Sequence, residues 1–368
     1  MQILKNKNIL VISPEAWGKS MLSKHHYAIE LTKTGNRVWF LQPPKNQITQ
    51  NFTVPPNIYL LDDHYTLPGL RHLPTRIRKA VFKNRIQKLE RDTNVQFDII
   101  WNFDNSRFFD LDCFKCNFTI HHRMDYHYNY QNERASASAD VCLGVTSEIV
   151  DSMRVHNPHS YFVQHGHAEI HKSEVLLPKN SDKTRALYVG NLLIPFINWE
   201  WMQALISSQP EVNFYFVGSY DKGNLNNQVN PNRLKEVEKI GAQPNVILLG
   251  ERSPSEIRSF FDQVDILFAA YDAEKHPKVL ANSHKIMEYL GSGKPIICNQ
   301  MNEYRDHHDL LYMVSSKNEF LAQFDWVRRH PDLVNSQELK TKRLAFASEN
   351  SYANQVKRID DILLSWHK

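Results

Sequence analysis

Short apolar segments alternate with amphipathic helical patterns along most of this chain, and this alternation constrains its fold more than any other feature. In the first half the apolar segments are 9–13, 37–41, 98–101, 118–121, 140–145 and 160–164, and a helical pattern covers 21–32. In the second half they are 187–189, 214–217, 246–249, 266–270 and 296–298, separated by helical patterns near 199–208, 233–240, 254–262 and 283–290. Such alternation is typical of parallel strands joined by crossover helices. The sequence therefore predicts an α/β protein with two doubly wound parallel sheets.

The length of 368 residues fits two domains, since single domains commonly hold about 150 to 200 residues. The polar segment 167–184 has no clear strand pattern and is the natural linker between them. Open parallel sheets bind ligands at the carboxyl ends of their strands, where the topology reverses. We therefore expect the ligand site in a cleft between the domains.

The composition is that of an ordinary globular protein, with 42% apolar residues, 23% charged residues and a net charge of +4. So small a charge gives no reason to expect a nucleic-acid partner. The four cysteines fit reduced thiols in a cytosol. Cys113 and Cys116 have no second pair at zinc spacing, so we expect no metal ion there. No segment approaches the roughly 18 apolar residues of a spanning helix and no secretory pattern begins the chain, so we expect a cytoplasmic protein.

The segment 283–298 carries the most specific chemical pattern of the chain. It predicts a capped helix, a glycine turn and a short buried strand. The first turn of such a helix offers backbone N–H groups and a positive dipole end to an anion, so we expect the backbone at Ser283 and His284 to bind a diphosphate. Lys285 would add a cation, and Glu288 would accept hydrogen bonds from ribose hydroxyls. The alternative is that Lys285 and Glu288 form only a surface ion pair.

This segment resembles a signature of the glycosyltransferases of the GT-B fold, in particular a bacterial group that carries Lys-x-x-Glu-Tyr-Leu-x-x-Gly-Lys-Pro-Val. The matching residues are Lys285, Glu288, Tyr289, Leu290, Gly293, Lys294, Pro295 and Ile296. The segments 186–190, 213–218 and 245–250 look like the family's successive strand-then-glycine units. In the N-terminal half the likeness is thinner and depends on 139–147 and 35–38.

The resemblance implies two Rossmann-like domains that face a cleft. These would be an acceptor-side domain at 1–168, a nucleotide-sugar-binding domain at 169–350, and a helix at 351–368 that packs back on the first domain. It implies transfer of a sugar from a nucleoside-diphosphate donor, which we expect to be uridine-linked, to a saccharide or lipid-linked acceptor in surface polysaccharide assembly. Gly18 stands where related enzymes carry glycines that approach the acceptor or the donor phosphate. Arg252 resembles the position that edges the nucleobase pocket, and a solvated arginine is the alternative.

An inverting transfer also needs a carboxylate or a histidine that deprotonates the acceptor hydroxyl. Asp125 is our candidate, because it follows a predicted strand and resembles an Asp-x-x-Asp segment of related enzymes; capping of the next helix is the alternative. His122 lies near enough in sequence to hydrogen-bond a sugar hydroxyl. No Asp-x-Asp metal motif accompanies these residues, so we expect no metal ion and no cofactor besides the donor substrate.

The chain departs from the family at two positions. Gly190 is followed by Asn191 and apolar residues, where many retaining members have an arginine and a lysine that neutralise the diphosphate, and Leu280 replaces an acidic residue. Retention and inversion therefore both stay open. Two alternative functions also stay open, namely a non-catalytic scaffold that binds a nucleotide sugar or a glycan, and a sugar-nucleotide epimerase of the same fold.

The tripeptide 18–20, Gly-Lys-Ser, copies the end of a P-loop and makes phosphoryl transfer a rival function. A P-loop needs glycine where Ser13 stands, and Pro14 lacks an N–H group that the phosphate nest requires, so we reject this function. A nicotinamide enzyme is also disfavoured, because the chain contains no G-x-G-x-x-G motif.

The segment 71–91 holds eight lysines and arginines against Glu90 alone. Its apolar residues Ile77, Val81, Ile86 and Leu89 are spaced for one helical stripe. Basic amphipathic helices dock on anionic membranes, which predicts peripheral contact with the inner face of a membrane and a lipid-linked acceptor. The alternative is a domain helix whose stripe faces its own sheet.

Overall fold

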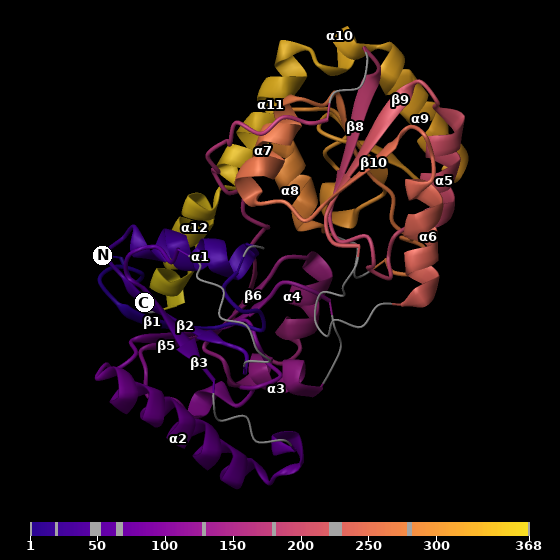
Figure 1. The fold of residues 1–368 in the computed structure, drawn as a ribbon. Coiled ribbons are helices and arrows are strands. Elements are labelled where there is room, and N and C mark those ends of the chain that lie inside the picture. Colours follow the sequence, from indigo (N-terminus) through magenta and orange to yellow (C-terminus); the bar gives the residue numbers. More distant parts are fainter. Residues whose placement is uncertain are drawn as a thin grey trace. The chain divides into compact units, whose positions relative to one another are not determined.

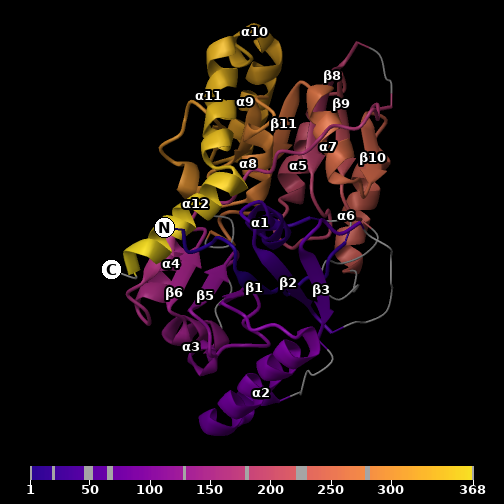
Figure 2. The ribbon, with the colours of Figure 1, turned by 90° about the vertical axis from the view of Figure 1, so that its left-hand side faces the viewer.

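The computed structural model describes residues 2–18, 21–44, 53–63, 69–126, 130–178, 182–220, 230–277 and 282–366. The chain divides into two compact units, one formed by Met1–His165 with Tyr352–Lys368 and the other by Gly166–Ser351. Each unit contains its own parallel sheet covered by helices (Figures 1 and 2). No helix of the described residues is both long enough and apolar enough to cross a membrane.

The first unit is built on a seven-stranded sheet in the order β3-β2-β1-β4-β5-β6-β7. Its strands are β1 (Asn8–Ile12), β2 (Arg37–Gln42), β3 (Ile58–Asp62), β4 (Ile99–Asn102), β5 (Phe118–Arg123), β6 (Val141–Gly144) and β7 (Ser160–Phe162). All neighbouring strands pair in parallel. The chain runs outward from β1 to β3 and then returns to β4 on the other side of β1. The topology therefore reverses between β1 and β4, which is where parallel sheets bind ligands.

The helices of the first unit include one from the far end of the chain. They are α1 (Ser23–Thr32), α2 (Thr75–Thr93), α3 (Tyr130–Ser138), α4 (Ser147–Arg154) and α12 (Tyr352–Trp366), with the short 3₁₀ turns η1 (Leu70–His72) and η2 (Leu111–Cys113). α12 packs against α1, where the ring centroids of Tyr27 and Tyr352 lie 5.0 Å apart. The Leu4 backbone N–H donates a 2.6 Å hydrogen bond to Asp360 Oδ1 on α12. Both ends of the chain therefore contribute to this unit.

The long helix α2 uses most of its apolar stripe inside the first unit. Phe82, Ile86 and Leu89 belong to the hydrophobic core, and Val81 packs against that core. Ile77, which the sequence placed on the same stripe, is instead 53% exposed. The apolar face of α2 is therefore that of a domain helix along most of its length, as the alternative interpretation of 71–91 predicted.

The basic residues of α2 do not form one solvent-facing surface. Arg78 pairs with Asp110 and Arg85 pairs with Asp63, and all four side chains are buried. Arg76 is exposed. Two of the positive charges that the sequence assigned to a membrane-facing surface are therefore neutralised inside the protein.

The second unit is built on a six-stranded parallel sheet in the order β10-β9-β8-β11-β12-β13. Its strands are β8 (Thr184–Val189), β9 (Val212–Val217), β10 (Val246–Gly250), β11 (Ile266–Ala269), β12 (Ile296–Asn299) and β13 (Tyr312–Val314). The sheet grows from β8 to β10 on one side and from β11 to β13 on the other. Its topology therefore reverses between β8 and β11.

Helices flank this second sheet. They are α5 (Trp199–Ser208), α6 (Pro231–Gly241), α7 (Pro254–Asp262), α8 (His284–Leu290), α9 (Lys317–Arg329), α10 (Pro331–Val334) and α11 (Gln337–Glu349), with the 3₁₀ turn η3 (Asn302–Tyr304). Local sequence sets several of their starts. α7 begins with a capping box between Ser253 and Glu256 and has Pro254 in its first turn, where a missing N–H group does no harm.

Candidate functional site

Glycine ends two neighbouring strands of the second sheet and lets other groups approach their carboxyl ends closely. Gly190 follows β8 with φ +146°, and Gly218 follows β9 with φ +142°. A Cβ atom on Gly190 would lie 2.0 Å from Lys285 Nζ, and one on Gly218 would lie 2.1 Å from the Gly190 carbonyl oxygen. Only glycine tolerates both the backbone conformation and the contact. Gly190 thus makes room for Lys285, and Gly218 makes room for the Gly190 backbone.

Lys285 lies at the point where the second sheet reverses its topology. Its Nζ donates hydrogen bonds to Tyr271 Oη at 2.8 Å and to Tyr188 Oη at 3.2 Å. Tyr188 belongs to β8 and Tyr271 lies two residues after the end of β11, so the two tyrosines come from the two strands that flank the reversal. We call these three residues the lysine–tyrosine cluster.

The charge of Lys285 is buried among neutral groups. The residue is 8% exposed, and its Nζ lies 4.9 Å from the ring centroid of Tyr188 and 5.3 Å from that of Tyr271. Among the described residues no carboxylate forms an ion pair with it, so the surface ion pair with Glu288 that the sequence allowed is not formed. Phenol oxygens and aromatic faces orient an ammonium group but carry no counter-charge.

Glu288 follows one helical turn after Lys285 and is half-buried. Burial raises the pKa of its carboxyl group to about 7, and the positive charge of Lys285 opposes that rise in pKa. The structure describes no hydrogen-bond partner for this carboxyl group within the ranges given above. A carboxylate held at its titration point beside a buried cation is typical of a ligand site.

α8 brings both residues to the sheet, but it is short. The helix has seven residues; Ser283 stands at its N-cap and His284 is its first residue, and both are half-buried. Ser283 makes no side-chain capping bond, which differs from the capped start that the sequence predicted. Tyr289 fixes the helix to the sheet, because its Oη accepts a 2.8 Å hydrogen bond from the Val189 N–H at the end of β8.

Arg252 lies apart from this cluster. It follows β10, the edge strand, which is separated from β8 by β9, so that roughly 10 Å of sheet lies between them at the usual strand spacing. Its side chain is 38% exposed and contacts Glu256 of α7 at 3.5 Å. The structure therefore places Arg252 in a surface ion pair and does not bring it together with Lys285 and Glu288.

His122 of the first unit is a buried, neutral side chain. It is 1% exposed, and the Trp101 indole N–H donates a 3.3 Å hydrogen bond to its Nδ1. Burial first, and His165 second, lower the pKa of His122 well below the usual value. Because Nδ1 accepts a hydrogen bond, the proton of the neutral ring sits on Nε2. His122 is therefore suited to donate a hydrogen bond from Nε2 and not to act as a base.

Asp125 follows β5 and is exposed. It makes no hydrogen bond or ion pair with the residues that the structure describes. α3 begins only at Tyr130, so Asp125 does not occupy the cap position of that helix, which was its alternative role. Gly18 lies in the loop between β1 and α1 at the carboxyl edge of the same sheet, whereas Lys19 and Ser20 of the P-loop-like tripeptide lie outside the described residues.

The Cys113 and Cys116 thiols are not arranged as metal ligands. Burial raises the pKa of each to about 12, so both carry their protons at neutral pH. Cys113 Sγ donates to the Asp110 carbonyl and Cys116 Sγ to the Phe118 carbonyl. Within the described part of the chain, no group of three or more His, Cys, Asp or Glu side chains is placed to hold a metal ion.

The fold is shared with solved structures, whereas no protein-family model and no curated protein sequence matches the chain. Sucrose-phosphate synthase from Thermosynechococcus elongatus is similar with a TM-score of 0.71 and 12% identity, covering 98% of this chain and 99% of that one. Anabaena HepE in complex with UDP and glucose gives 0.67 and 12%, covering 98% and 100%. The catalytic domain of starch synthase IV from Arabidopsis thaliana, bound to ADP and acarbose, gives 0.67 and 9%, covering 98% and 99%. The chain has the two-sheet α/β architecture of these proteins, the GT-B fold that the sequence predicted.

Proposed function

We propose, from the GT-B fold of this chain and the buried cation of its second unit, that it transfers a sugar from a nucleoside-diphosphate donor to an acceptor hydroxyl. In this reaction the bond between the sugar carbon and the diphosphate oxygen breaks, and the diphosphate, which already carries two negative charges, leaves with a third. Groups that stabilise this leaving charge therefore determine the rate. The lysine–tyrosine cluster supplies such a group.

The buried charge of Lys285, which forms no ion pair with the described residues, is the observation that carries the proposal. A buried ammonium group without a carboxylate partner is costly for a folded protein. A phosphate oxygen at Nζ would offset this cost, while Tyr188 and Tyr271 hold the ammonium in place beforehand. The segment directly after Gly190 has no lysine or arginine, so Lys285 would neutralise the diphosphate. We therefore expect transfer to proceed without a divalent ion.

Glu288 would bind the ribose of the donor. An ionised carboxylate accepts two hydrogen bonds from neighbouring hydroxyls, and the site offers this carboxylate within the field of Lys285. We propose uridine as the nucleoside because the similar HepE structure contains UDP and glucose. Ser283 and His284, which flank the start of α8, would contribute backbone contacts to the same ligand.

The acceptor side of the proposal rests on the first unit. Asp125 is the candidate base, because an exposed carboxylate at the carboxyl end of a strand can take a proton from an acceptor hydroxyl. His122 would donate a hydrogen bond from Nε2 to a sugar oxygen, and Gly18 would admit the ligand close to the backbone. A saccharide or a lipid-linked saccharide of surface polysaccharide assembly is the acceptor class that we propose.

Calorimetry with UDP tests the donor site. Lys285→Met removes the charge and keeps the side-chain volume, and we expect UDP affinity to fall about 10- to 100-fold, the usual loss of one charge-assisted hydrogen bond. Lys294→Met is the matched control, since Lys294 lies at the other end of α8 before β12 and contacts the Asp262 carbonyl. Equal UDP affinities for wild type and Lys285→Met would refute the proposal.

Product analysis separates transfer from the two alternative functions. A transferase incubated with UDP-glucose releases UDP slowly by transfer to water, and EDTA should leave that rate unchanged. Tight UDP binding with no release of UDP would instead support a non-catalytic scaffold. A new sugar still attached to UDP would support an epimerase.

A further inference from the structure

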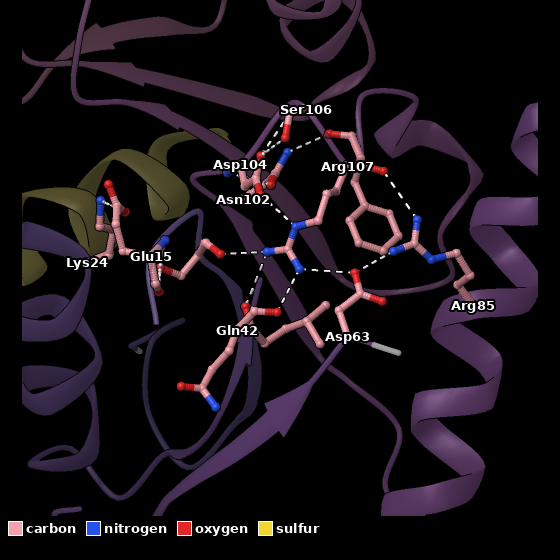
Figure 3. A network of polar contacts seen from close by, with 12 residues as sticks. Glu15, Lys24, Gln42, Asp63, Arg85, Asn102, Asp104, Ser106 and Arg107 are labelled. Carbon is pink, nitrogen blue, oxygen red and sulfur yellow. Dashed lines mark hydrogen bonds and ion pairs between the residues drawn. The ribbon is translucent and has the colours of Figure 1, made fainter. Parts of the chain in front are cut away.

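Arg107 of the first unit uses its whole guanidinium group in buried contacts (Figure 3). Nε donates to Asp104 Oδ2 at 2.6 Å. Nη1 donates to the Gln42 carbonyl at 2.7 Å and to Asp63 Oδ2 at 3.0 Å. Nη2 donates to the Ser13 carbonyl at 2.5 Å. A longer contact of 3.4 Å joins Nη2 to the carbonyl of Leu41. These five contacts equal the number of N–H donors that a guanidinium offers.

The acceptors come from the ends of four neighbouring strands. Ser13 follows β1, Gln42 ends β2, Asp63 follows β3 and Asp104 follows β4. These strands stand side by side in the order β3-β2-β1-β4, which includes the reversal of the first sheet. Arg107 thus joins the carboxyl ends of four strands at the edge where such a sheet binds ligands.

The charges around Arg107 balance inside the protein. Asp63 Oδ2 also accepts a 2.5 Å hydrogen bond from Arg85 Nη2, and the Arg85 guanidinium lies 4.2 Å from the ring centroid of Phe108. Two arginines therefore face two aspartates, Asp63 and Asp104, in a region that is about 5% exposed. Buried ion-pair networks of this kind seldom stabilise a fold more than apolar side chains of equal volume would, but they hold one geometry rigidly.

The loop from β1 to α1 is held on both sides of Gly18. Before it, the Trp17 N–H donates to Gln42 Oε1 at 2.9 Å. His25 then closes the loop, since its Nδ1 accepts from the Leu22 N–H at 3.0 Å and its Nε2 contacts the Ala16 carbonyl at 3.1 Å. Burial lowers the pKa of His25 to about 4, so the ring is neutral and can accept and donate at once.

A second contact across this loop comes from Lys24 of α1, which pairs with Glu15. Together with the Arg107 contact to Ser13, these bonds fix the described residues on either side of Gly18. We infer that Arg107 is a positioning residue, which holds residues 13–18 of the β1–α1 loop in the geometry that sugar transfer by this protein requires. The inference rests on the proposed function, and it adds a residue that touches neither the donor phosphate nor the acceptor.

Arg107→Lys tests the inference against Arg78→Lys. The first variant keeps the positive charge for Asp63 and Asp104 but cannot reach all the strand-end carbonyls. Arg78 is the matched control, because it is also buried and paired, with Asp110, and among the described residues it donates to one backbone carbonyl, that of Leu73. We expect both variants to fold and to bind UDP with wild-type affinity.

The two variants should then differ in two measurements. In Arg107→Lys the kcat for UDP-glucose hydrolysis should fall at least tenfold with little change in KM, and amide exchange of residues 13–18 should accelerate at least tenfold. Arg78→Lys should change neither quantity. Gln42→Leu, which releases the Trp17 N–H without leaving a buried charge unpaired, should accelerate exchange in the same segment.

Wild-type kcat in Arg107→Lys, or equal losses of kcat in Arg107→Lys and Arg78→Lys at equal melting temperature, would overturn the inference. Unchanged exchange of residues 13–18 would overturn it as well. Failure of the proposed function has a different signature, because the wild-type protein would then bind no UDP in calorimetry or would release no UDP from UDP-glucose.

Discussion

Lowering the pH from 8 to 6 should weaken donor binding through Glu288. Its carboxyl group has a pKa of about 7 in the folded protein, so about nine-tenths of it is ionised at pH 8 and about one-tenth at pH 6. If ribose binding needs the ionised form, the association constant falls about tenfold over this range, or about 1.4 kcal/mol. UDP-glucose is the right probe because its diphosphate is a diester and does not titrate between these values.

Calorimetry at pH 6, 7 and 8 measures this dependence, and Glu288→Gln isolates it. The variant should bind UDP-glucose weakly and with almost the same affinity at all three values, because the amide has no proton to lose. Any remaining slope in the variant belongs to other groups and is subtracted. A wild-type affinity that does not change with pH, or a slope as steep in the variant as in the wild type, would refute the role given to Glu288.

The raised pKa of Glu288 also affects the stability of the fold. Lowering the pH should weaken donor binding but increase the free energy of unfolding. The folded-state pKa of about 7 lies above the ordinary value of 4.5, so the folded protein holds this proton more tightly than the unfolded chain does. Stability contributed by Glu288 is then fully present below about pH 4.5 and is lost as the pH rises toward 7. Glu288→Gln should therefore increase the free energy of unfolding at pH 8 by up to about 3 kcal/mol and so raise the melting temperature. Near pH 4 the melting temperature should be unchanged. A stabilised protein that binds the donor poorly is the expected pattern for a ligand site.

Three further predictions concern other parts of the molecule. Gly190→Ala should weaken UDP binding at least tenfold in calorimetry, because the new Cβ would lie 2.0 Å from Lys285 Nζ. Gly69→Ala is the control, because Gly69 also has a positive φ, of +81°, but no atom within 4 Å of a new Cβ, and UDP affinity should stay unchanged. Contact of α2 with a membrane, which the sequence predicts, requires that replacing exposed Arg76 and Lys83 by glutamine reduce co-sedimentation with anionic vesicles. Unchanged co-sedimentation would contradict that expectation. Cys113 and Cys116 should react with iodoacetamide at pH 8 only after unfolding, since burial raises the pKa of both thiols to about 12; rapid alkylation of the native protein, followed by mass spectrometry, would contradict this.

The sequence predicted the central strands well because burial on both faces makes them uniformly apolar. β1 and β9 are fully buried or nearly so, and both were expected. The edge strands β3 and β13 were not expected. β3 has an apolar run of four residues, 58–61, like a buried strand, yet Tyr59 is 44% exposed and Leu60 is 36% exposed at the edge of the sheet. β13 has only three residues, too few for any period to show.

The candidate donor site was predictable in its residues but not in its contacts. The signature pointed to Lys285 and Glu288, yet their spacing also allowed an ion pair between them. The partners that Lys285 has in the structure, Tyr188 and Tyr271, lie 97 and 14 residues away in sequence. Only the sheet order, which places β8 beside β11, brings these hydroxyls to one ammonium group.

In the basic segment 71–91, too, the local sequence pattern did not reveal the partners of charged side chains. The lysines and arginines of this segment predicted one cationic face on α2. Arg78 and Arg85 are instead neutralised by Asp110 and Asp63, which lie in loops that the helix pattern cannot reveal. The buried ring of contacts around Arg107 was equally hidden, because its acceptors are mostly backbone carbonyls, which every residue type possesses.

The pairing of α12 with α1 sets an order for folding during synthesis. Leu4 and Tyr27 leave the ribosome early, yet their partners Asp360 and Tyr352 are made only after all of the second unit. Nascent chains fold domain by domain as each becomes available. The second unit can therefore complete its core first. The first unit stays incomplete, with the apolar surface that α12 covers still exposed, until α12 has been synthesised.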